Sequence, residues 1–123
     1  MLIESEKDKL KDGVKKVLSS ADNFVNFYPE DGACDEGPSY WAHAGGELGS
    51  LLKWLMDASA ERISFEDQIK LKNIGGYIIN SRIAENRYVN FADAFAVENI
   101  SPLKLWNYYL VFKDKDFGGF ASY

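Results

Sequence analysis

The chain has little cysteine, histidine and proline, and it has no long apolar run. Its 123 residues include one cysteine, one histidine and three prolines. A single cysteine cannot form a disulfide within the chain and does not indicate a cellular compartment. No run of about 18 apolar residues occurs, so we expect no membrane-spanning segment and no membrane partner. The first residues are charged rather than apolar, so no signal peptide is predicted there.

Basic residues are also too few for one class of partner. Lys and Arg total 14 against 19 Asp and Glu, which gives a net charge of −5. Such a chain lacks the broad positive surface that binds nucleic acid, so we expect no nucleic-acid partner. Aromatic residues, by contrast, are abundant at 15%. They can line a sugar-binding groove, or they can fill the core or a protein contact, and composition leaves both open.

Apolar residues recur every three or four positions in four stretches, which predicts an all-α chain. Proline at position 29 ends the first stretch. Ser64 followed by Asp67 resembles a capping box, and Ser101 followed by Pro102 is a typical helix start. The predicted helices cover about residues 4–28, 39–58, 64–83 and 101–112. The short run RYVNFADA, residues 87–94, is the exception and is predicted to be non-helical.

Glycines interrupt two of these predicted helices. Gly45, Gly46 and Gly49 lie in the second, and Gly75 and Gly76 lie in the third. Each glycine in a helix interior costs roughly 1 kcal/mol relative to alanine. We therefore expect a neighbouring helix or a ligand to approach these positions closely.

The segment DGACDEGPSYW, residues 31–41, resembles a loop of the heparinase II/III-like polysaccharide lyases, DGG-x-x-EGP-x-YW. In that family the loop joins two helices of an (α/α) toroid. The resemblance implies that residues 1–123 form antiparallel helical hairpins within an incomplete (α/α) toroid. The rest of the toroid and a C-terminal β-sandwich would lie outside this chain. The matching residues are Asp31, Gly32, Glu36, Gly37, Pro38, Tyr40 and Trp41.

This resemblance implies that an acidic, uronic-acid-containing polysaccharide is cleaved by β-elimination, in the periplasm or outside the cell. The proton on C5, beside the carboxyl group, is removed, and the 4-O-linked sugar leaves. Such a site needs an acid/base and groups that neutralise the carboxylate. No cofactor is expected in this segment, since the family's zinc belongs to the β-sandwich. We expect the isolated 123 residues to be inactive, because half a toroid lacks one wall of the cleft. Whether the protein forms a homo-oligomer is left open by the sequence.

Two catalytic residues are predicted from the resemblance. Glu36 occupies the position of the family's loop glutamate and would contact the substrate carboxylate. Tyr88 lies in the later non-helical segment, where the family has its acid/base tyrosine. Each has a structural alternative: Glu36 and Asp35 would favour the start of the next helix through its dipole, and Tyr88 would pack at the start of a loop.

Further residues are predicted to contact a saccharide. Trp41 is in phase with the apolar face of its helix, so core packing is its alternative, whereas Tyr40 is predicted at the surface. A lone histidine such as His43 is often structural. In an extended segment Asn90 would share one face with the preceding tyrosine. The predicted substrate-binding residues are Tyr40, Trp41, His43, Arg87 and Asn90.

One departure from the family leaves the function open. The family places Asn or His near the loop glutamate, but the corresponding stretch here is Gly32-Ala33-Cys34. Arg82 and Arg87 can supply positive charge instead, and Asp93 is interpreted as a residue that organises the loop. Cys34 has no second ligand at a useful spacing, so no metal site is predicted. The rival hypotheses are a non-catalytic helical module that binds a glycan or a protein, and an unrelated helical domain.

Overall fold

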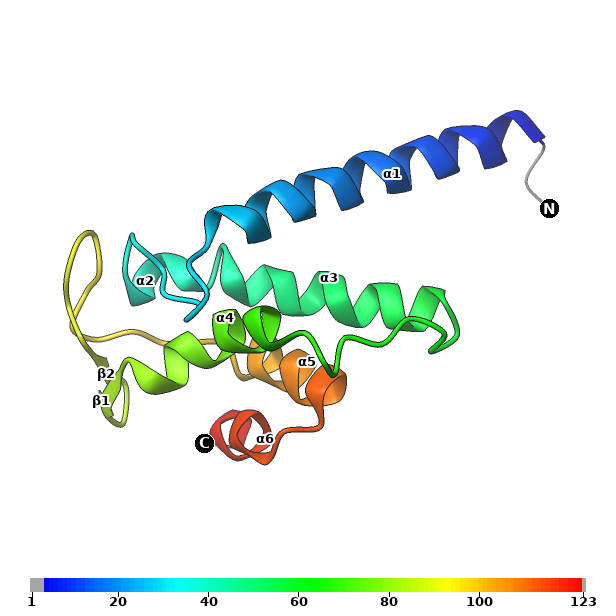
Figure 1. Cartoon of the computed structure of the whole chain (residues 1–123). Helices are drawn as coiled ribbons and strands as arrows, with labels where there is room; N and C mark the ends of the chain where they lie inside the picture. The colour runs from blue at the N-terminus through cyan, green and yellow to red at the C-terminus, as the bar shows by residue number, and fades with distance from the viewer. Residues whose placement is uncertain (1–3, 123) are drawn as a thin grey trace.

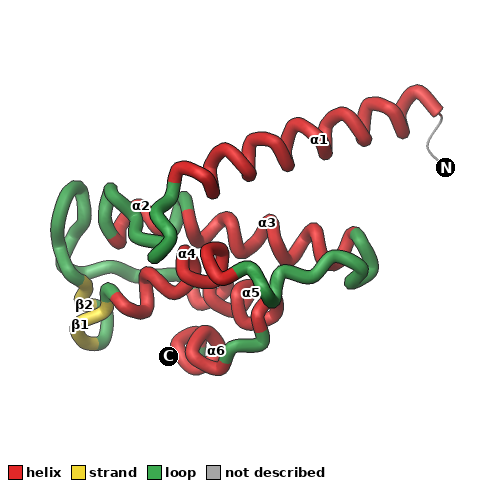
Figure 2. The backbone as a smooth tube through the Cα atoms, in the orientation of Figure 1, coloured by secondary structure: helices red, strands yellow, loops and turns green. Residues whose placement is uncertain are grey.

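The computed structural model describes residues 4–122, with side chains from Glu6 onward. Helices dominate this part of the chain, and one short two-stranded ribbon interrupts them (Figures 1 and 2). The prediction of a mostly helical fold is confirmed. The helices are α1 (Glu4–Phe27), α2 (Pro38–Trp41), α3 (Gly45–Ala58), α4 (Ile69–Asn80), α5 (Pro102–Phe112) and α6 (Lys115–Ala121), and the strands are β1 (Arg82–Ala84) and β2 (Arg87–Tyr88).

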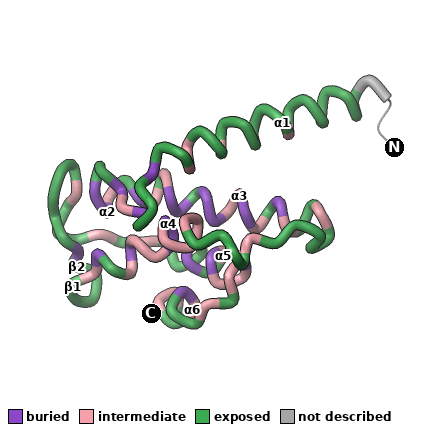
Figure 3. The backbone as a smooth tube through the Cα atoms, viewed as in Figure 1, coloured by how far each residue is buried: buried purple, intermediate pink, exposed green. Residues whose placement is uncertain are grey.

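Helices α3, α4 and α5 form the body of the molecule. In Figure 1, α3 and α5 run in one direction and α4 runs in the opposite direction, while α6 packs against α5. Helix α1 passes over α3 and diverges from it toward the N-terminus, and its residues 6–13 are exposed (Figure 3). None of the helices in residues 4–122 is both long enough and apolar enough to cross a membrane.

The core is organised around the ring of Tyr108 on α5. A Cβ atom added at Gly49 of α3 would lie 2.6 Å from one edge of this ring, and one added at Gly75 of α4 would lie 2.3 Å from the other edge. The hydroxyl group of Tyr108 donates a hydrogen bond of 2.6 Å to the carbonyl oxygen of Gly45. The expectation of a close approach is confirmed at Gly49 and Gly75, where the approaching group is the tyrosine ring. It is wrong at Gly76, where the nearest atom to an added Cβ would be 4.0 Å away.

Buried side chains form two groups. One group joins the loop after α1 to α3, α4 and α5, and the other, which includes the Tyr108 ring, joins α2, α4, the ribbon, α5 and α6. The first contains Tyr28, Cys34, Leu48, Leu52, Ile74 and Val111. The second contains Trp41, Ile78, Tyr88, Leu105, Tyr108 and Phe117.

The second predicted helix is broken into two. Residues 42–44 form a turn between α2 and α3, and Ala44 has φ −115° and ψ −92°. The turn lets the Trp41 ring lie against the start of α3, where a Cβ atom on Gly45 would be 2.7 Å from its Nε1. Tertiary packing of one large ring therefore overrides the continuous helical pattern of the sequence.

The third predicted helix starts later and ends earlier than the sequence pattern indicates. Its N-cap is Gln68 and not Ser64, because Phe65 turns toward the core and its carbonyl accepts a hydrogen bond of 2.9 Å from the Gln68 amide. The helix ends at Asn80, where the chain enters β1. The start of α5 at Pro102 is as predicted. Helix α6 is not predicted, although Asp114 caps it by accepting a hydrogen bond from the Asp116 amide.

We call the close packing of Gly49 and Gly75 on the Tyr108 ring the tyrosine clamp. It predicts opposite effects at two adjacent glycines of α4. Gly75→Ala should lower the free energy of unfolding by about 1–3 kcal/mol, because the added methyl group collides with the Tyr108 ring. Gly76→Ala should instead raise it by up to about 1 kcal/mol, since its nearest new contact is 4.0 Å away and alanine favours the helix. Urea denaturation measures both. Equal stability of the two variants would contradict the clamp.

Candidate functional site

The loop between α1 and α2 is seated on α4. Gly32 has φ +77°, and a Cβ atom there would lie 2.3 Å from the backbone of Asn73 and Ile74. The side chain of Asn73 donates a hydrogen bond of 2.8 Å to the carbonyl oxygen of Glu30. Within the loop, the Ala33 amide donates to the Asp31 carboxylate at 3.0 Å. These contacts fix the first half of the DGACDEGPSYW segment.

The second half of that segment lies against the loop that follows β2. Gly37 has φ +89°, and a Cβ atom there would lie 2.7 Å from both the Ala94 side chain and the Phe91 carbonyl oxygen. The Oγ atom of Ser39 accepts a hydrogen bond of 2.8 Å from the Phe95 amide and donates one to the Glu98 carboxylate. Two segments more than fifty residues apart are thus held side by side, as Figure 1 shows beside α2.

A surface pocket of about 770 Å³ opens at this junction. We call it the Tyr40 pocket. Its walls combine exposed aromatic rings, one imidazole, two hydroxyl groups and two carboxylates, which are groups that can stack on a sugar ring and bond its hydroxyls. The side chain of Tyr40 is 44% exposed and that of Phe95 is 72% exposed. Its lining residues include Ser39, Tyr40, His43, Asp93, Phe95 and Glu98.

A second pocket, of about 400 Å³, contains Tyr88. We call it the Arg82 pocket. The chain from 96 to 98 follows β2: the Tyr88 amide donates to the Ala96 carbonyl at 3.0 Å, and the Glu98 amide donates to the Asn86 carbonyl at 2.9 Å. This pairing brings the Glu98 side chain to both pockets. The residues of the Arg82 pocket include Arg82, Glu85, Asn86, Tyr88, Glu98 and Phe120.

The Tyr88 side chain is 3% exposed. Burial raises the pKa of its hydroxyl group, the positive charge of Arg82 opposes the shift, and the negative charge of Glu98 adds to it. The hydroxyl group is therefore protonated at neutral pH and holds its proton more tightly than an exposed tyrosine does.

Glu36, the other predicted catalytic residue, lies elsewhere. Its side chain is exposed and lines a third pocket, of about 190 Å³, with Tyr28 and Cys34. It borders neither the Tyr40 pocket nor the Arg82 pocket. The structure therefore brings Tyr40 and His43 together in one pocket, but it does not place Glu36 and Tyr88 in a common one.

Three predicted substrate contacts lie outside these two pockets. Trp41 is completely buried, and its Nε1 donates a hydrogen bond of 2.7 Å to the Ile74 carbonyl, so it supports the pocket from the core instead of lining it. Asn90 is exposed whereas Tyr88 is buried, because β2 ends at Tyr88 and the alternation does not continue. Arg87 is exposed and borders neither pocket, while Arg82 borders one.

Three pocket residues were not predicted from the sequence. Ser39 lies at the variable position of the EGP-x-YW motif, so its place in the motif could have predicted a position near the pocket. Phe95 and Glu98 lie in an aperiodic stretch, and only the tertiary fold brings them to the pocket. Asp93, interpreted from the sequence as a loop organiser, also lines it.

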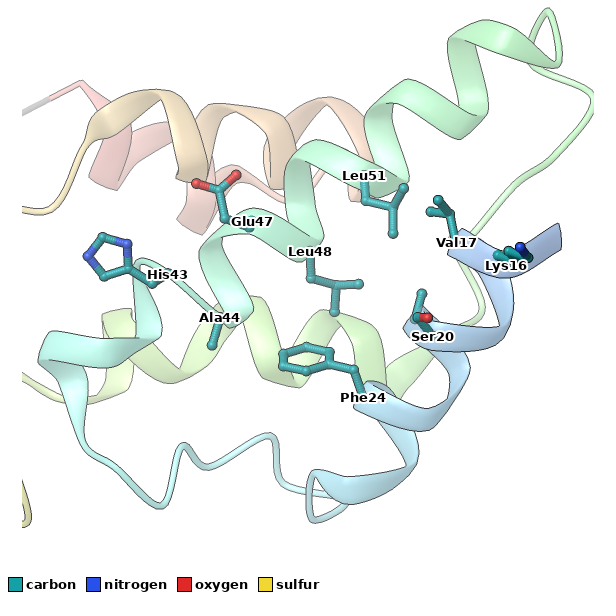
Figure 4. A pocket seen from close by; sticks show the side chains of 10 residues that line it. Lys16, Val17, Ser20, Phe24, His43, Ala44, Glu47, Leu48 and Leu51 are labelled. Atoms are coloured by element: carbon teal, nitrogen blue, oxygen red, sulfur yellow. The ribbon is translucent and has the colours of Figure 1, made fainter. Parts of the chain in front are cut away.

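His43 also borders an apolar groove of about 500 Å³ between α1 and α3. Figure 4 shows Phe24 of α1 facing Leu48 of α3 there, with His43 at the end of the groove near the start of α3. The groove consists mainly of carbon surface and lacks the clustered polar groups of the Tyr40 pocket. Among residues 4–122, no three His, Cys, Asp or Glu side chains are grouped so that they could hold a metal ion.

Comparison with known proteins adds no further information about this site. No protein-family model matches the chain, and a search of curated proteins finds no significant match.

The junction behind the Tyr40 pocket can be tested at Ser39. Ser39→Ala removes the acceptor of the Phe95 amide, so exchange of that amide with deuterium should become about tenfold faster. Ser50→Ala is the matched control, because it also removes one acceptor, that of the Asn107 side chain at 3.1 Å, but on a different face. Unchanged exchange at Phe95 in Ser39→Ala would contradict this role.

Stability should fall as pH rises above the ordinary tyrosine pKa of 10.0. Burial raises the pKa of four tyrosines, so at such pH the unfolded chain loses protons that the native chain still holds, and deprotonation favours unfolding. Urea unfolding between about pH 9 and pH 11 measures this slope. Tyr88→Phe should make it shallower, and an unchanged slope would argue against the burial effect at Tyr88. The four are Tyr28, Tyr77, Tyr88 and Tyr108.

Proposed function

We propose that the chain carries part of the saccharide site of a lyase that cleaves a uronic-acid-containing polysaccharide by β-elimination. One observation supports this most directly: the EGP-x-YW loop, which resembles the lyase motif, lies against the RYVNFADA segment. The contact runs from Gly37 to Phe91 and Ala94, and from Ser39 to the Phe95 amide. In the resembling family these two segments contribute to one active site.

The helical arrangement is compatible with the toroid part of this proposal. Helices α3, α4 and α5 alternate in direction along the chain, as successive hairpins of an (α/α) toroid do (Figure 1). We propose on this basis that they belong to an incomplete toroid. An acidic polysaccharide substrate and a periplasmic or secreted location follow from the same resemblance and belong to the same proposal.

The side chains support distinct roles in such a reaction. Removal of the C5 proton leaves negative charge on the uronate carboxyl group, and a nearby cation or hydrogen-bond donor stabilises it. The Glu98 carboxylate, which borders the same pocket as Tyr88, would take the C5 proton, and Tyr88, protonated at neutral pH, would give a proton to the departing sugar oxygen. Tyr40 and Phe95 offer aromatic faces to a sugar ring. Glu36 would contact the carboxylate of a substrate that is long enough to reach the separate pocket lined by Glu36.

The experiment uses the natural protein that contains these residues, incubated with several uronate polymers. Tyr88→Phe and Glu36→Gln should each lower release of unsaturated uronate products at least about a hundredfold. Tyr109→Phe, whose ring packs on Trp106 at 4.9 Å, and the exposed Glu66→Gln are the matched controls and should retain activity. Full activity in both test variants would refute the assigned roles.

A second candidate is a non-catalytic module that binds a glycan through the Tyr40 pocket. Two observations favour it: Glu36 and Tyr88 line different pockets, and the Tyr40 pocket contains the carboxylates of Asp93 and Glu98. Binding of an oligosaccharide without any unsaturated product, across the same set of polymers, would support this candidate. Detection of any unsaturated product would exclude it.

A further inference from the structure

The Tyr40 pocket and the Arg82 pocket have different chemical characters. The Tyr40 pocket has aromatic faces, the imidazole of His43 and two carboxylates, and no lysine or arginine among the side chains of residues 6–122 lines it. The Arg82 pocket also has two carboxylates, those of Glu85 and Glu98, but it adds a guanidinium group, the amide of Asn86 and the buried Tyr88. A carboxylate is therefore disfavoured in the first pocket and has a cationic partner in the second.

Arg82 is held in place at its pocket. Its Nε atom donates a hydrogen bond to the carbonyl oxygen of Glu85, and its guanidinium carbon lies 4.7 Å from the centre of the Phe120 ring. Arg82 also lies opposite Tyr88 in the β1–β2 ribbon. The cation is thus positioned next to the tyrosine and does not have to be ordered by a ligand.

Glu98 lies between the two pockets and borders both. Its backbone amide is bound to the Asn86 carbonyl, and its carboxylate accepts the hydrogen bond of Ser39. The two pockets are therefore adjacent and share one wall, which is anchored from both sides.

We propose that these pockets are neighbouring subsites for one saccharide chain. The uronate residue lies in the Arg82 pocket, with its carboxylate close to Arg82 and its ring beside Tyr88. The adjoining sugar, which carries no carboxylate, lies against Tyr40 and Phe95. This inference rests on the proposed saccharide-binding function and adds to it the order of the sugars and the residue that recognises the uronate.

The charges around Arg82 predict how substitutions change the binding of an acidic sugar. Glu85 and Glu98 border the same pocket, so a bound carboxylate experiences both attraction and repulsion there. Removing the cation should weaken binding of an acidic sugar, and removing the Glu85 charge should strengthen it. Neither change should alter binding of a sugar that has no charge.

The test measures binding of tetrasaccharides from hyaluronan, heparosan and chondroitin, in which uronate and uncharged sugars alternate, to the full chain by calorimetry. Each is paired with its carboxyl-reduced, uncharged counterpart. Wild type should prefer the acidic member of at least one pair. Arg82→Gln should weaken binding of that acidic member about tenfold and leave the reduced member unchanged. Arg82→Lys should keep most of the preference, and Glu85→Gln should increase it.

The subsite order is tested with Tyr40→Ala. This variant should weaken both members of a pair by the same factor, because it removes a stacking face from the uncharged sugar and leaves the Arg82 pocket intact. Loss of the carboxyl preference in Tyr40→Ala would show that the uronate lies in the other pocket. Unaltered binding of the reduced member serves as the check that Arg82→Gln is folded.

The outcomes separate this inference from the function on which it rests. If wild type binds acidic and reduced members equally, or if Arg82→Gln keeps the full preference, the subsite assignment is wrong while saccharide binding stands. If wild type binds no member of any pair, saccharide binding by this chain is itself refuted, and the subsite assignment is refuted with it.

Discussion

The ring of Tyr108, clamped between Gly49 and Gly75, is the constraint on which the rest of this structure depends. Both glycines let a helix backbone come so close to the ring that a single methyl group would collide with it. The hydroxyl group of the same tyrosine bonds the Gly45 carbonyl at the start of α3. One side chain of α5 therefore sets the separation of α3 and α4 and fixes where α3 begins, so these three helices are positioned as a unit.

The candidate site depends on this unit through a second buried ring. Trp41 follows the motif loop, lies against the start of α3 and donates its hydrogen bond to Ile74 of α4. Because Trp41 is anchored in the core, the neighbouring Tyr40 is left at the surface. The loop from β2 to α5 then closes over this corner through Ser39. A rigid helical core thus supports a site whose surface is made mostly from loops.

Charge is the main physical difficulty for a uronate-binding site on this chain. The net charge is −5, and two carboxylates border the Tyr40 pocket. Long-range attraction cannot bring an acidic polymer to such a surface, so recognition has to come from short-range, fixed groups. Arg82, held by the Glu85 carbonyl and the Phe120 ring, is a group of this kind. Arg82 also lies opposite Tyr88 in the β1–β2 ribbon, so its charge lies beside the residue that we propose as the proton donor.

The sequence by itself determined the helical class, the first helix, the start of α5 at Pro102 and the presence of closely packed glycines. These are consequences of short-range periodicity, proline geometry and the missing Cβ atom, all of which are local. Only the tertiary structure decided that the second helix breaks at 42–44, because the break serves the packing of Trp41 against α3 and α4. It also decided that Glu36 and Tyr88 line different pockets and that Glu98 joins two of them. These relations depend on contacts between residues far apart in the chain, and no pattern of neighbouring residues encodes them.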